Sequence, residues 1–181
     1  ERKKKIVSQV LRLADKVTVQ FERYRDGYPD YLRKKIVAIH NPVTSAVEFA
    51  VPSGEKEKTK TLLCVGRLAY QKNIDVLIQT FAALSSNFPT WNLLIVGDGE
   101  DRKKLEDMIT HLDMSERIAL MPSVKNVQSL YCSAHLFCLP SRWEGFPNAL
   151  AEAMAHGLPS VGFAGCSGVS DLIEDNRNGF L

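Results

Sequence analysis

Two glutamates stand eight positions apart in the segment 140–159, and their surroundings favour a role in ligand binding. Glu144 lies in an expected loop directly before Gly145, whereas Glu152 lies between Ala151 and Ala153 on an expected helix. A helix of such small residues packs closely against a sheet, so a carboxylate on it is unusual. The alternative is that Glu144 only favours the positive end of the helix dipole and that Glu152 is only an exposed glutamate.

The stretch between these glutamates is typical of an anion site. We expect backbone N–H groups to be available where the helix starts, reinforced by the helix dipole. The residues concerned are Gly145, Phe146, Pro147 and Asn148, of which proline contributes no N–H. Two carboxylates beside an anion site fit a ligand that has a phosphate centre and hydroxyl-bearing arms, such as a nucleotide sugar.

A second candidate anion site follows the apolar run 61–66. Gly66 provides a turn, and Arg67 and Lys72 are two cations five positions apart just before an expected helix. Arg67 can bind phosphate oxygens in a fork, whereas Lys72 acts as a point charge. The alternative is that both are ordinary solvated loop cations.

The segment Gly97-Asp98-Gly99-Glu100 partly resembles a dinucleotide-binding fingerprint. That fingerprint needs a third glycine, and Arg102 stands at its position. We therefore expect Asp98 or Gly99 to start the following helix instead.

Strand-like apolar runs alternate with amphipathic stretches of helical length, which predicts an α/β fold. The strands are expected at 61–66, 91–96, 117–121, 134–139 and, as the last one, 159–163. The helices are expected at 74–84, 105–112, 127–133 and 147–156. Continuous apolar strands with helical crossovers indicate a doubly wound parallel sheet that is covered on both faces. In such sheets ligands bind beyond the carboxyl ends of the strands, where the candidate residues lie.

The first 43 residues have a similar rhythm. A basic amphipathic helix around Ile6, Val10 and Leu13 leads to expected strands at 16–20 and 35–40. We interpret 1–43 as the tail of one α/β domain, 44–60 as a linker, and 61–181 as a more complete domain that is truncated at its end. We expect the chain to be a fragment of a longer protein.

The composition excludes several classes of protein. The chain has 181 residues, of which 45% are hydrophobic and 24% charged, so disorder is excluded. Its net charge of +2 argues against a dedicated nucleic-acid binder, and no apolar run approaches the ~20 residues that span a bilayer. Four cysteines without zinc-site spacing favour a reducing, cytoplasmic location with no disulfide and no structural metal.

These motifs together resemble glycosyltransferase family 4. The resemblance rests on Glu144-(x7)-Glu152, on the Gly-Phe-Pro after the first glutamate, and on the earlier Gly66-Arg67…Lys72. It covers residues 35–181, and the wording of 141–159 is close to bacterial exopolysaccharide, capsule and O-antigen transferases. The family consists of retaining GT-B enzymes that use nucleotide-diphosphate sugars, which implies a Rossmann-like C-terminal domain here.

The resemblance also implies roles for individual residues. It assigns Arg67 and Lys72 to the diphosphate, and Glu152 to the ribose hydroxyls. Glu144, as the catalytic candidate, and the backbone amides of 145–148 would face the donor sugar and the distal phosphate. The base would lie near the loop 121–124. Asn73 stands where the family often has glycine, a small departure because asparagine tolerates the left-handed conformation. Asp171 replaces a common glutamate, so no role is assigned to it.

The implied reaction is hexosyl transfer to a glycan or lipid-linked acceptor in surface polysaccharide biosynthesis. It needs a nucleotide-sugar co-substrate but no cofactor, no metal and no nucleic acid. The full-length enzyme would lie in the cytoplasm, either free or at the inner face of the membrane. An acceptor-binding domain would come mainly from outside this chain, so the fragment alone should be inactive. Two rivals stay open: a non-catalytic nucleotide-sugar-binding module, which needs neither glutamate, and an NAD domain, which needs an intact glycine fingerprint.

Overall fold

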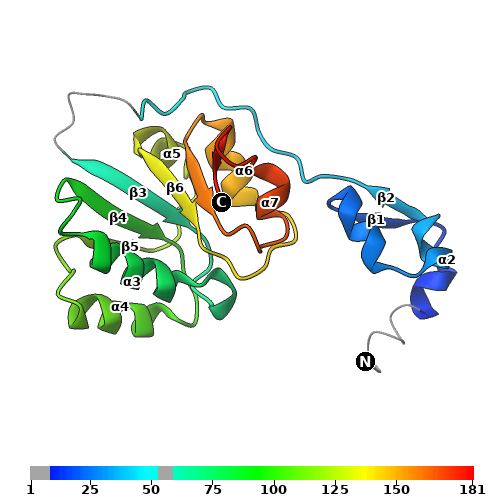
Figure 1. Ribbon diagram of the computed structural model, residues 1–181, viewed down its shortest axis with the longest axis horizontal. Helices are drawn as coiled ribbons and strands as arrows, with labels where there is room; N and C mark the ends of the chain where they lie inside the picture. The colour runs from blue at the N-terminus through cyan, green and yellow to red at the C-terminus, as the bar shows by residue number, and fades with distance from the viewer. Residues whose placement is uncertain (1–8, 53–58) are drawn as a thin grey trace. The chain divides into compact units, whose positions relative to one another are not determined.

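The computed structural model describes residues 9–52 and 59–181 (Figure 1). By its internal contacts the chain divides into two compact units, residues 1–42 and 43–181, and each unit is described by itself. Within the described residues, no helix combines the length and the apolar content that crossing a bilayer requires.

The second unit contains a six-stranded parallel sheet with the strand order β5-β4-β3-β6-β7-β8. Its strands are β3 (Lys60–Val65), β4 (Trp91–Val96), β5 (Ile118–Met121), β6 (Leu136–Leu139), β7 (Ser160–Gly162) and β8 (Gly179–Phe180). Each strand pairs in parallel with its neighbours, for example Cys64 with Ile95 and Leu62 with Leu136. The prediction of a doubly wound parallel α/β sheet is therefore confirmed.

Helices cover the sheet on both faces (Figure 1). The helices α3 (Ile74–Leu84) and α4 (Arg102–His111) share one buried apolar cluster with the sheet. The helices α5 (Gln128–Ser133), α6 (Asn148–Ala155) and α7 (Val169–Leu172) share the other cluster. This two-layer cover explains why the strands read as nearly continuous apolar runs rather than as alternating ones.

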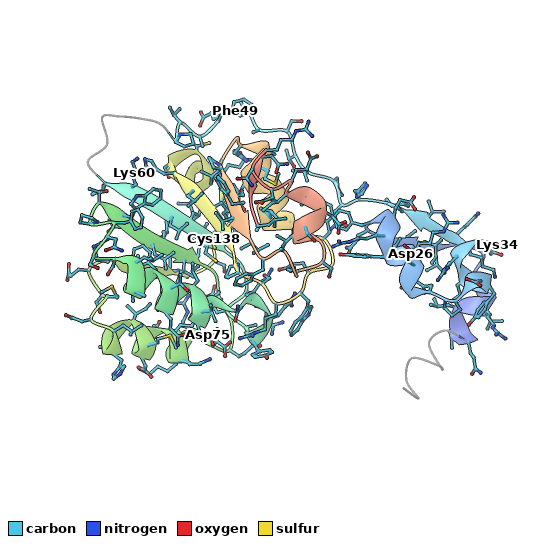
Figure 2. All side chains as sticks on the ribbon, viewed as in Figure 1. Asp26, Lys34, Phe49, Lys60, Asp75 and Cys138 are labelled. Atoms are coloured by element: carbon cyan, nitrogen blue, oxygen red, sulfur yellow. The ribbon has the colours of Figure 1, made fainter. Side chains whose placement is uncertain are left out.

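Two of the cysteines lie on the central strands of the sheet, within its apolar interior. Cys64 on β3 is 1% exposed, and Cys138 lies on β6 (Figure 2). Burial raises the pKa of the Cys138 thiol to about 12, and it raises the pKa of Cys64 as well. Both side chains therefore act as small apolar core residues rather than as reactive thiols.

The C-terminal part of this unit differs from the prediction. The strand at 159–163 is not the last one, because α7 and the two-residue strand β8 follow it. The helix α7 packs closely against β7 because Gly162 on β7 has no side chain. A Cβ atom at Gly162 would lie 2.3 Å from Cγ1 of Val169 on α7.

The first unit is small and contains a two-stranded parallel sheet. Strands β1 (Val17–Val19) and β2 (Ile36–Ala38) confirm the strands expected at 16–20 and 35–40. Between them lie the 3-10 helix η2 (Glu22–Gly27) and the short helix α2 (Asp30–Arg33). The expected basic helix falls largely outside the described residues. Its described end is the 3-10 turn η1 (Leu11–Leu13), where Leu13 is exposed.

Candidate functional site

The order of the strands reverses between β3 and β6, which places a crevice at their carboxyl ends. From β3 the chain continues outward to β4 and β5, whereas from β6 it continues in the opposite direction to β7 and β8. Ligands of doubly wound sheets bind at such a switch point. The two segments that carry the predicted site residues, 66–73 after β3 and 140–147 after β6, both start there.

A buried ion pair joins these two segments. Nζ of Lys72 lies 2.6 Å from Oε1 of Glu144, and their side chains are 18% and 7% exposed. The hydroxyl of Ser141 donates to the same carboxylate oxygen at 2.6 Å. On the other oxygen, Nε2 of Gln71 donates at 3.5 Å. The structure therefore brings together a predicted cation and a predicted carboxylate that are 72 residues apart.

The backbone around Lys72 is shaped to place its side chain in this pair. A Cβ atom at Gly66 would lie only 3.3 Å from Cε of Lys72, so glycine leaves room for the lysine to cross the turn. Asn73, between the 3-10 helix η3 (Tyr70–Lys72) and α3, adopts φ 56° and ψ 33°. The expectation that asparagine serves here in the left-handed conformation is confirmed.

Arg67 has a different carboxylate partner. Nη2 of Arg67 lies 3.1 Å from Oε2 of Glu100, and the side chains are 72% and 58% exposed. The pKa of Glu100 is lowered, first by a hydrogen bond to its own backbone and then by the Arg67 guanidinium. Exposed pairs of this kind contribute little to stability. An anionic ligand can therefore replace Glu100 as the partner of Arg67 at small cost.

Beside Arg67 lies a pocket of about 290 Å³ at the carboxyl ends of β3 and β4. It brings the predicted Gly66 and Arg67 next to the loop that was assigned to the base, here represented by Ser123 and Val124. The complete lining comprises Val65, Gly66, Arg67, Val96, Gly97, Asp98, Ser123, Val124 and Val127. Backbone and apolar side chains, one cation (Arg67), one carboxylate (Asp98) and the Ser123 hydroxyl thus surround a volume that fits part of a nucleotide.

Glu152 lies on α6, where a neighbouring helix supplies its partner. The hydroxyl of Tyr131 on α5 donates to Oε2 of Glu152 at 3.0 Å. Tyr131 is completely buried, and this burial, followed by the Glu152 charge, raises the pKa of its phenol. Tyr131 lies four residues after Val127, the N-cap of α5, so the two residues lie on the same face of this helix. Val127 also lines the pocket beside Arg67. A half-buried carboxylate held by a neutral phenol can accept further hydrogen bonds from ligand hydroxyls.

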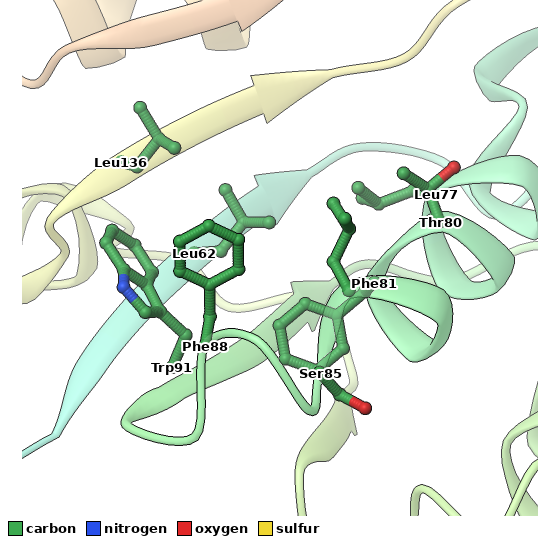
Figure 3. Close-up of a pocket in the computed structure, with 9 residues that line it drawn as sticks. Leu62, Leu77, Thr80, Phe81, Ser85, Phe88, Trp91 and Leu136 are labelled. Carbon is green, nitrogen blue, oxygen red and sulfur yellow. The ribbon is translucent and has the colours of Figure 1, made fainter.

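A different pocket, of about 240 Å³, lies between α3 and the amino-terminal ends of the strands (Figure 3). Its lining is almost wholly apolar and consists of Leu62, Leu77, Thr80, Phe81, Leu84, Ser85, Phe88, Trp91 and Leu136. Its walls carry no cation that could hold a phosphate. The candidate site is therefore the carboxyl-terminal edge of the sheet and not this pocket. Within the described residues, no group of His, Cys, Asp and Glu is arranged to hold a metal ion.

The family model for glycosyl transferases group 1 matches residues 45–181. The chain belongs to this family. The matched range includes every predicted site residue and all of the six-stranded sheet. The doubly wound sheet of this group 1 chain is also the fold of solved GT-B glycosyltransferases.

Named relatives of this group 1 chain include glycosyltransferases of two bacteria. An uncharacterized glycosyltransferase of Haemophilus influenzae is 38% identical over 146 residues, which cover 81% of this chain and 40% of the relative. A lipopolysaccharide 1,6-galactosyltransferase of Salmonella typhimurium is 33% identical, over 81% of this chain and 41% of the relative. The chain thus spans about 40% of the length of these relatives.

One solved structure is the pneumococcal O-GlcNAc transferase GtfA in complex with UDP and GlcNAc. It is 26% identical, with a TM-score of 0.82, over 93% of this chain and 34% of the solved chain. A second is the S. aureus TarM G117R mutant in complex with Fondaparinux, alpha-GlcNAc-glycerol and UDP. It is 25% identical, with a TM-score of 0.84, over all of this chain and 36% of that chain.

At the start of α6 in the group 1 chain, the expectation that the backbone N–H of Asn148 is available to an anion is wrong. The amide of Asn148 donates to the carbonyl of Phe146 at 3.0 Å, so the tight turn before the helix already uses this N–H. Pro147 has none to offer, as expected. The turn is further fixed by the loop after β7, because a Cβ atom at Gly168 would lie 2.7 Å from the carbonyl oxygen of Gly145.

The prediction that Asp98 or Gly99 starts the following helix is also wrong. The helix α4 begins at Arg102. Asp98 instead joins the loops after β4 and β5, since it accepts hydrogen bonds from the amide of Ser123 at 2.8 Å and from the Ser123 hydroxyl. Arg102 donates to the other carboxylate oxygen at 2.9 Å. The bonds from Ser123, more than the Arg102 charge, lower the pKa of Asp98.

Sequence reasoning missed four residues that hold the candidate site: Gln71, Glu100, Tyr131 and Ser141. Three had a usable signal, because Ser141, Glu100 and Gln71 follow β6, β4 and β3 at the same edge of the sheet. Tyr131 had no such signal. Its partner Glu152 is 21 positions away, and no periodicity links the two residues.

Proposed function

We propose that this chain is the donor-binding part of a retaining family 4 glycosyltransferase. The longer enzyme would transfer a hexose from a nucleoside-diphosphate sugar to a glycan or lipid-linked acceptor of a surface polysaccharide. In this proposal residues 1–43 are the tail of an N-terminal domain, 44–60 a linker, and 61–181 the donor-binding domain. Family membership and the UDP bound in two similar solved structures support it.

The observation that carries the proposal is the pairing of Lys72 with Glu144 at the switch point of the sheet. Burying two opposite charges is costly unless geometry and further hydrogen bonds are good. A fold that needed only stability could use apolar residues here. A buried cation and a buried carboxylate beside a nucleotide-sized pocket are, by contrast, useful for a ligand that carries phosphates and hydroxyls.

Each site residue has a role that its position supports. Arg67, which has only an exposed partner, binds the diphosphate together with Lys72. Glu144 contacts the donor sugar near the reacting carbon, and Glu152 accepts hydrogen bonds from the ribose hydroxyls. The turn Gly145, Phe146, Pro147 and Asn148 shapes the wall that faces the distal phosphate and the sugar. The base occupies the pocket beside Ser123 and Val124.

The reaction in this proposal is a front-face displacement. The bond between the anomeric carbon and the phosphate oxygen breaks, and the acceptor oxygen forms a new bond on the same face. The acceptor proton passes to an oxygen of the departing diphosphate. Lys72 and Arg67 stabilise the negative charge that develops on that leaving group, which is the electrostatic contribution that enzymes make most often.

A thermal-shift screen of this chain tests the proposal. The ligands are UDP, GDP, UDP-glucose, UDP-N-acetylglucosamine and NAD, each added to the unmodified chain and to the double variant Lys72→Met/Glu144→Gln, which removes both charges of the buried pair. We expect at least one nucleoside diphosphate or its sugar to raise the melting temperature. A ligand at 100 times its dissociation constant stabilises a folded protein by about 2.7 kcal/mol.

The matched control is Lys104→Met. Lys104 also pairs with a carboxylate, Asp75 on α3 (Figure 2), at 3.2 Å, but its side chain is 55% exposed and lies outside the site. The proposal predicts that Lys72→Met/Glu144→Gln loses the ligand-induced shift and that Lys104→Met keeps it. Stabilisation by NAD alone, or equal shifts in both variants, would contradict the proposal.

A further inference from the structure

Two large aromatic side chains lie exposed at the rim of the candidate site. Tyr70 is 65% exposed and Trp143 is 50% exposed. Their ring centroids are 6.0 Å apart with an interplanar angle of 53°. Neither belongs to the three buried clusters of the described residues, so they do not serve the core. Exposed aromatic pairs of this kind mark binding surfaces more often than scattered apolar residues do.

The pair is held in place by the backbone on both sides. Nε2 of Gln71 donates to the carbonyl of Trp143 at 2.8 Å, and the amide of Arg142 donates to the carbonyl of Gln71 at 2.9 Å. The guanidinium of Arg142 lies 4.4 Å from the centre of the Tyr70 ring. Its Nε also donates to the Tyr70 carbonyl at 3.2 Å. The surface is thus preorganised, which lowers the entropy lost when a ligand binds to it.

The rings lie directly beside the charged centre of the site. Trp143 precedes Glu144, and Tyr70 is two residues before Lys72. Gln71 connects the two regions, because the same amide nitrogen that contacts Trp143 also reaches Glu144 at 3.5 Å. A ligand group on the rings is therefore a neighbour of a sugar held at Glu144.

We infer that Tyr70 and Trp143 form a platform on which a pyranose ring of the acceptor glycan stacks. The inference rests on the proposed transferase function. A pyranose presents an apolar face of C–H groups with hydroxyls around its edge. The open face of one aromatic ring fits that face, and the second ring, inclined at 53° to the first, borders the edge of the sugar. The platform suits the acceptor rather than the donor diphosphate, because neither ring carries a charge that could hold a phosphate, whereas the charged Lys72 and Glu144, which are assigned to the donor, lie beside it.

The platform can be tested by fluorescence, because the chain has two tryptophans, Trp91 and Trp143. In a Trp91→Phe background Trp143 is the single reporter. It is titrated with methyl glycosides and disaccharides of glucose, galactose and N-acetylglucosamine, with and without saturating UDP. We expect at least one sugar to change the emission of Trp143 saturably in the presence of UDP.

Substitutions at Tyr70 distinguish a loss of sugar stacking from a loss of UDP binding or of stability. Tyr70→Ala should weaken sugar binding by about fivefold and leave the UDP affinity unchanged, whereas Tyr70→Phe should keep both. Phe88→Ala is the matched control, since Phe88 is similarly exposed, at 52%, but belongs to the apolar pocket at the opposite ends of the strands.

Two results would overturn the platform. One is the lack of a saturable response to every sugar while UDP binds. The other is a response that UDP abolishes, which would place the sugar in the donor position. If UDP itself did not bind, the proposed function would fail, and a Tyr70-dependent sugar response would still report on the platform separately.

Discussion

Lys72 and Glu144 are the residues whose surroundings explain most about the site. Oε1 of Glu144 accepts hydrogen bonds from both Lys72 and Ser141, so its charge is compensated before any ligand arrives. Removing one partner of such a pair leaves a buried charge without compensation, which is strongly destabilising. Amide substitutions of the glutamates are therefore better probes than truncations, because they keep size and part of the hydrogen bonding.

The two glutamates should give different kinetic results in the full-length enzyme. Glu152→Gln weakens the acceptance of ribose hydroxyls, so we expect mainly a loss of donor affinity. A lost charge-assisted hydrogen bond corresponds to about 1.5–3 kcal/mol, or roughly tenfold to a hundredfold. Glu144→Gln lies nearer the reacting sugar and should lower kcat more than donor binding.

Steady-state kinetics beside the melting temperature of each variant checks this difference. Tyr131→Phe is a useful companion, because it removes the hydroxyl that donates to Glu152 and keeps the ring in the core. If both glutamate variants kept their kinetics and lost only stability, the glutamates would be structural, and the non-catalytic module would be the better interpretation.

At the scale of elements, glycines let the loops after β3 and β4 meet at the edge of the sheet. A Cβ atom at Gly99 would lie 2.2 Å from the carbonyl oxygen of Leu68, and one at Gly97 would lie 1.8 Å from that of Gly66. These carbonyls belong to the loop that carries Arg67. The glycines that suggested a dinucleotide fingerprint therefore shape the loop that carries Arg67 through backbone contact.

Gly99→Ala should displace this loop. We expect a loss of stability of about 1–3 kcal/mol, typical of overpacking, and a weaker response to UDP. Urea unfolding and the UDP-induced thermal shift measure the two effects. Gly165→Ala is the matched control, because a Cβ atom there meets nothing within 4 Å. Equal behaviour of the two variants would show that the contact between the loops is unimportant.

Asp98 makes the contact between the loops after β4 and β5 dependent on pH. Its pKa is lowered in the folded protein, chiefly by the hydrogen bonds from Ser123. A group with a depressed folded pKa stabilises the fold above its ordinary pKa, and this contribution is lost as the pH falls through the folded value. We expect Asp98→Asn to be less stable than the unmodified chain at pH 7, with a smaller difference below pH 4.

Stability measured by urea unfolding between pH 3 and pH 7 tests this expectation. Ser123→Ala should move the acid transition to higher pH, because it removes the hydroxyl that bonds the Asp98 carboxylate. A constant difference between Asp98→Asn and the unmodified chain at all pH values would contradict the assignment.

The elements show which parts of the molecule the sequence could predict. The strands β3, β4 and β6 were predictable because each is an apolar run with turn residues behind it. By contrast, α7 and β8, with four and two residues, are too short to show any periodicity. The pairing of Lys72 with Glu144 was not predictable either, because it depends on β3 and β6 being neighbours across 72 residues. The Phe146–Asn148 hydrogen bond depends on a turn geometry that residue types alone do not define.

At the scale of the whole molecule, the proposal assigns to this chain the donor surface, and only part of the acceptor surface, that a transferase needs. It spans about 40% of its named relatives, and the described first unit offers only a two-stranded sheet. Catalysis of a transfer requires both substrates to be held in a reactive geometry. We therefore expect the chain by itself to have negligible sugar-transfer activity. A radiolabelled-donor assay with residues 1–181 checks this, and robust transfer without another chain would contradict it.

The central claim, that the carboxyl-terminal edge of the sheet binds a nucleoside diphosphate, is tested most directly by calorimetric titration. UDP, GDP and NAD are titrated separately into the same preparation of the chain at constant salt. The account predicts that UDP or GDP binds at least about tenfold more tightly than NAD, because Arg67 and Lys72 recognise a terminal diphosphate. Tighter binding of NAD than of every nucleoside diphosphate would contradict it.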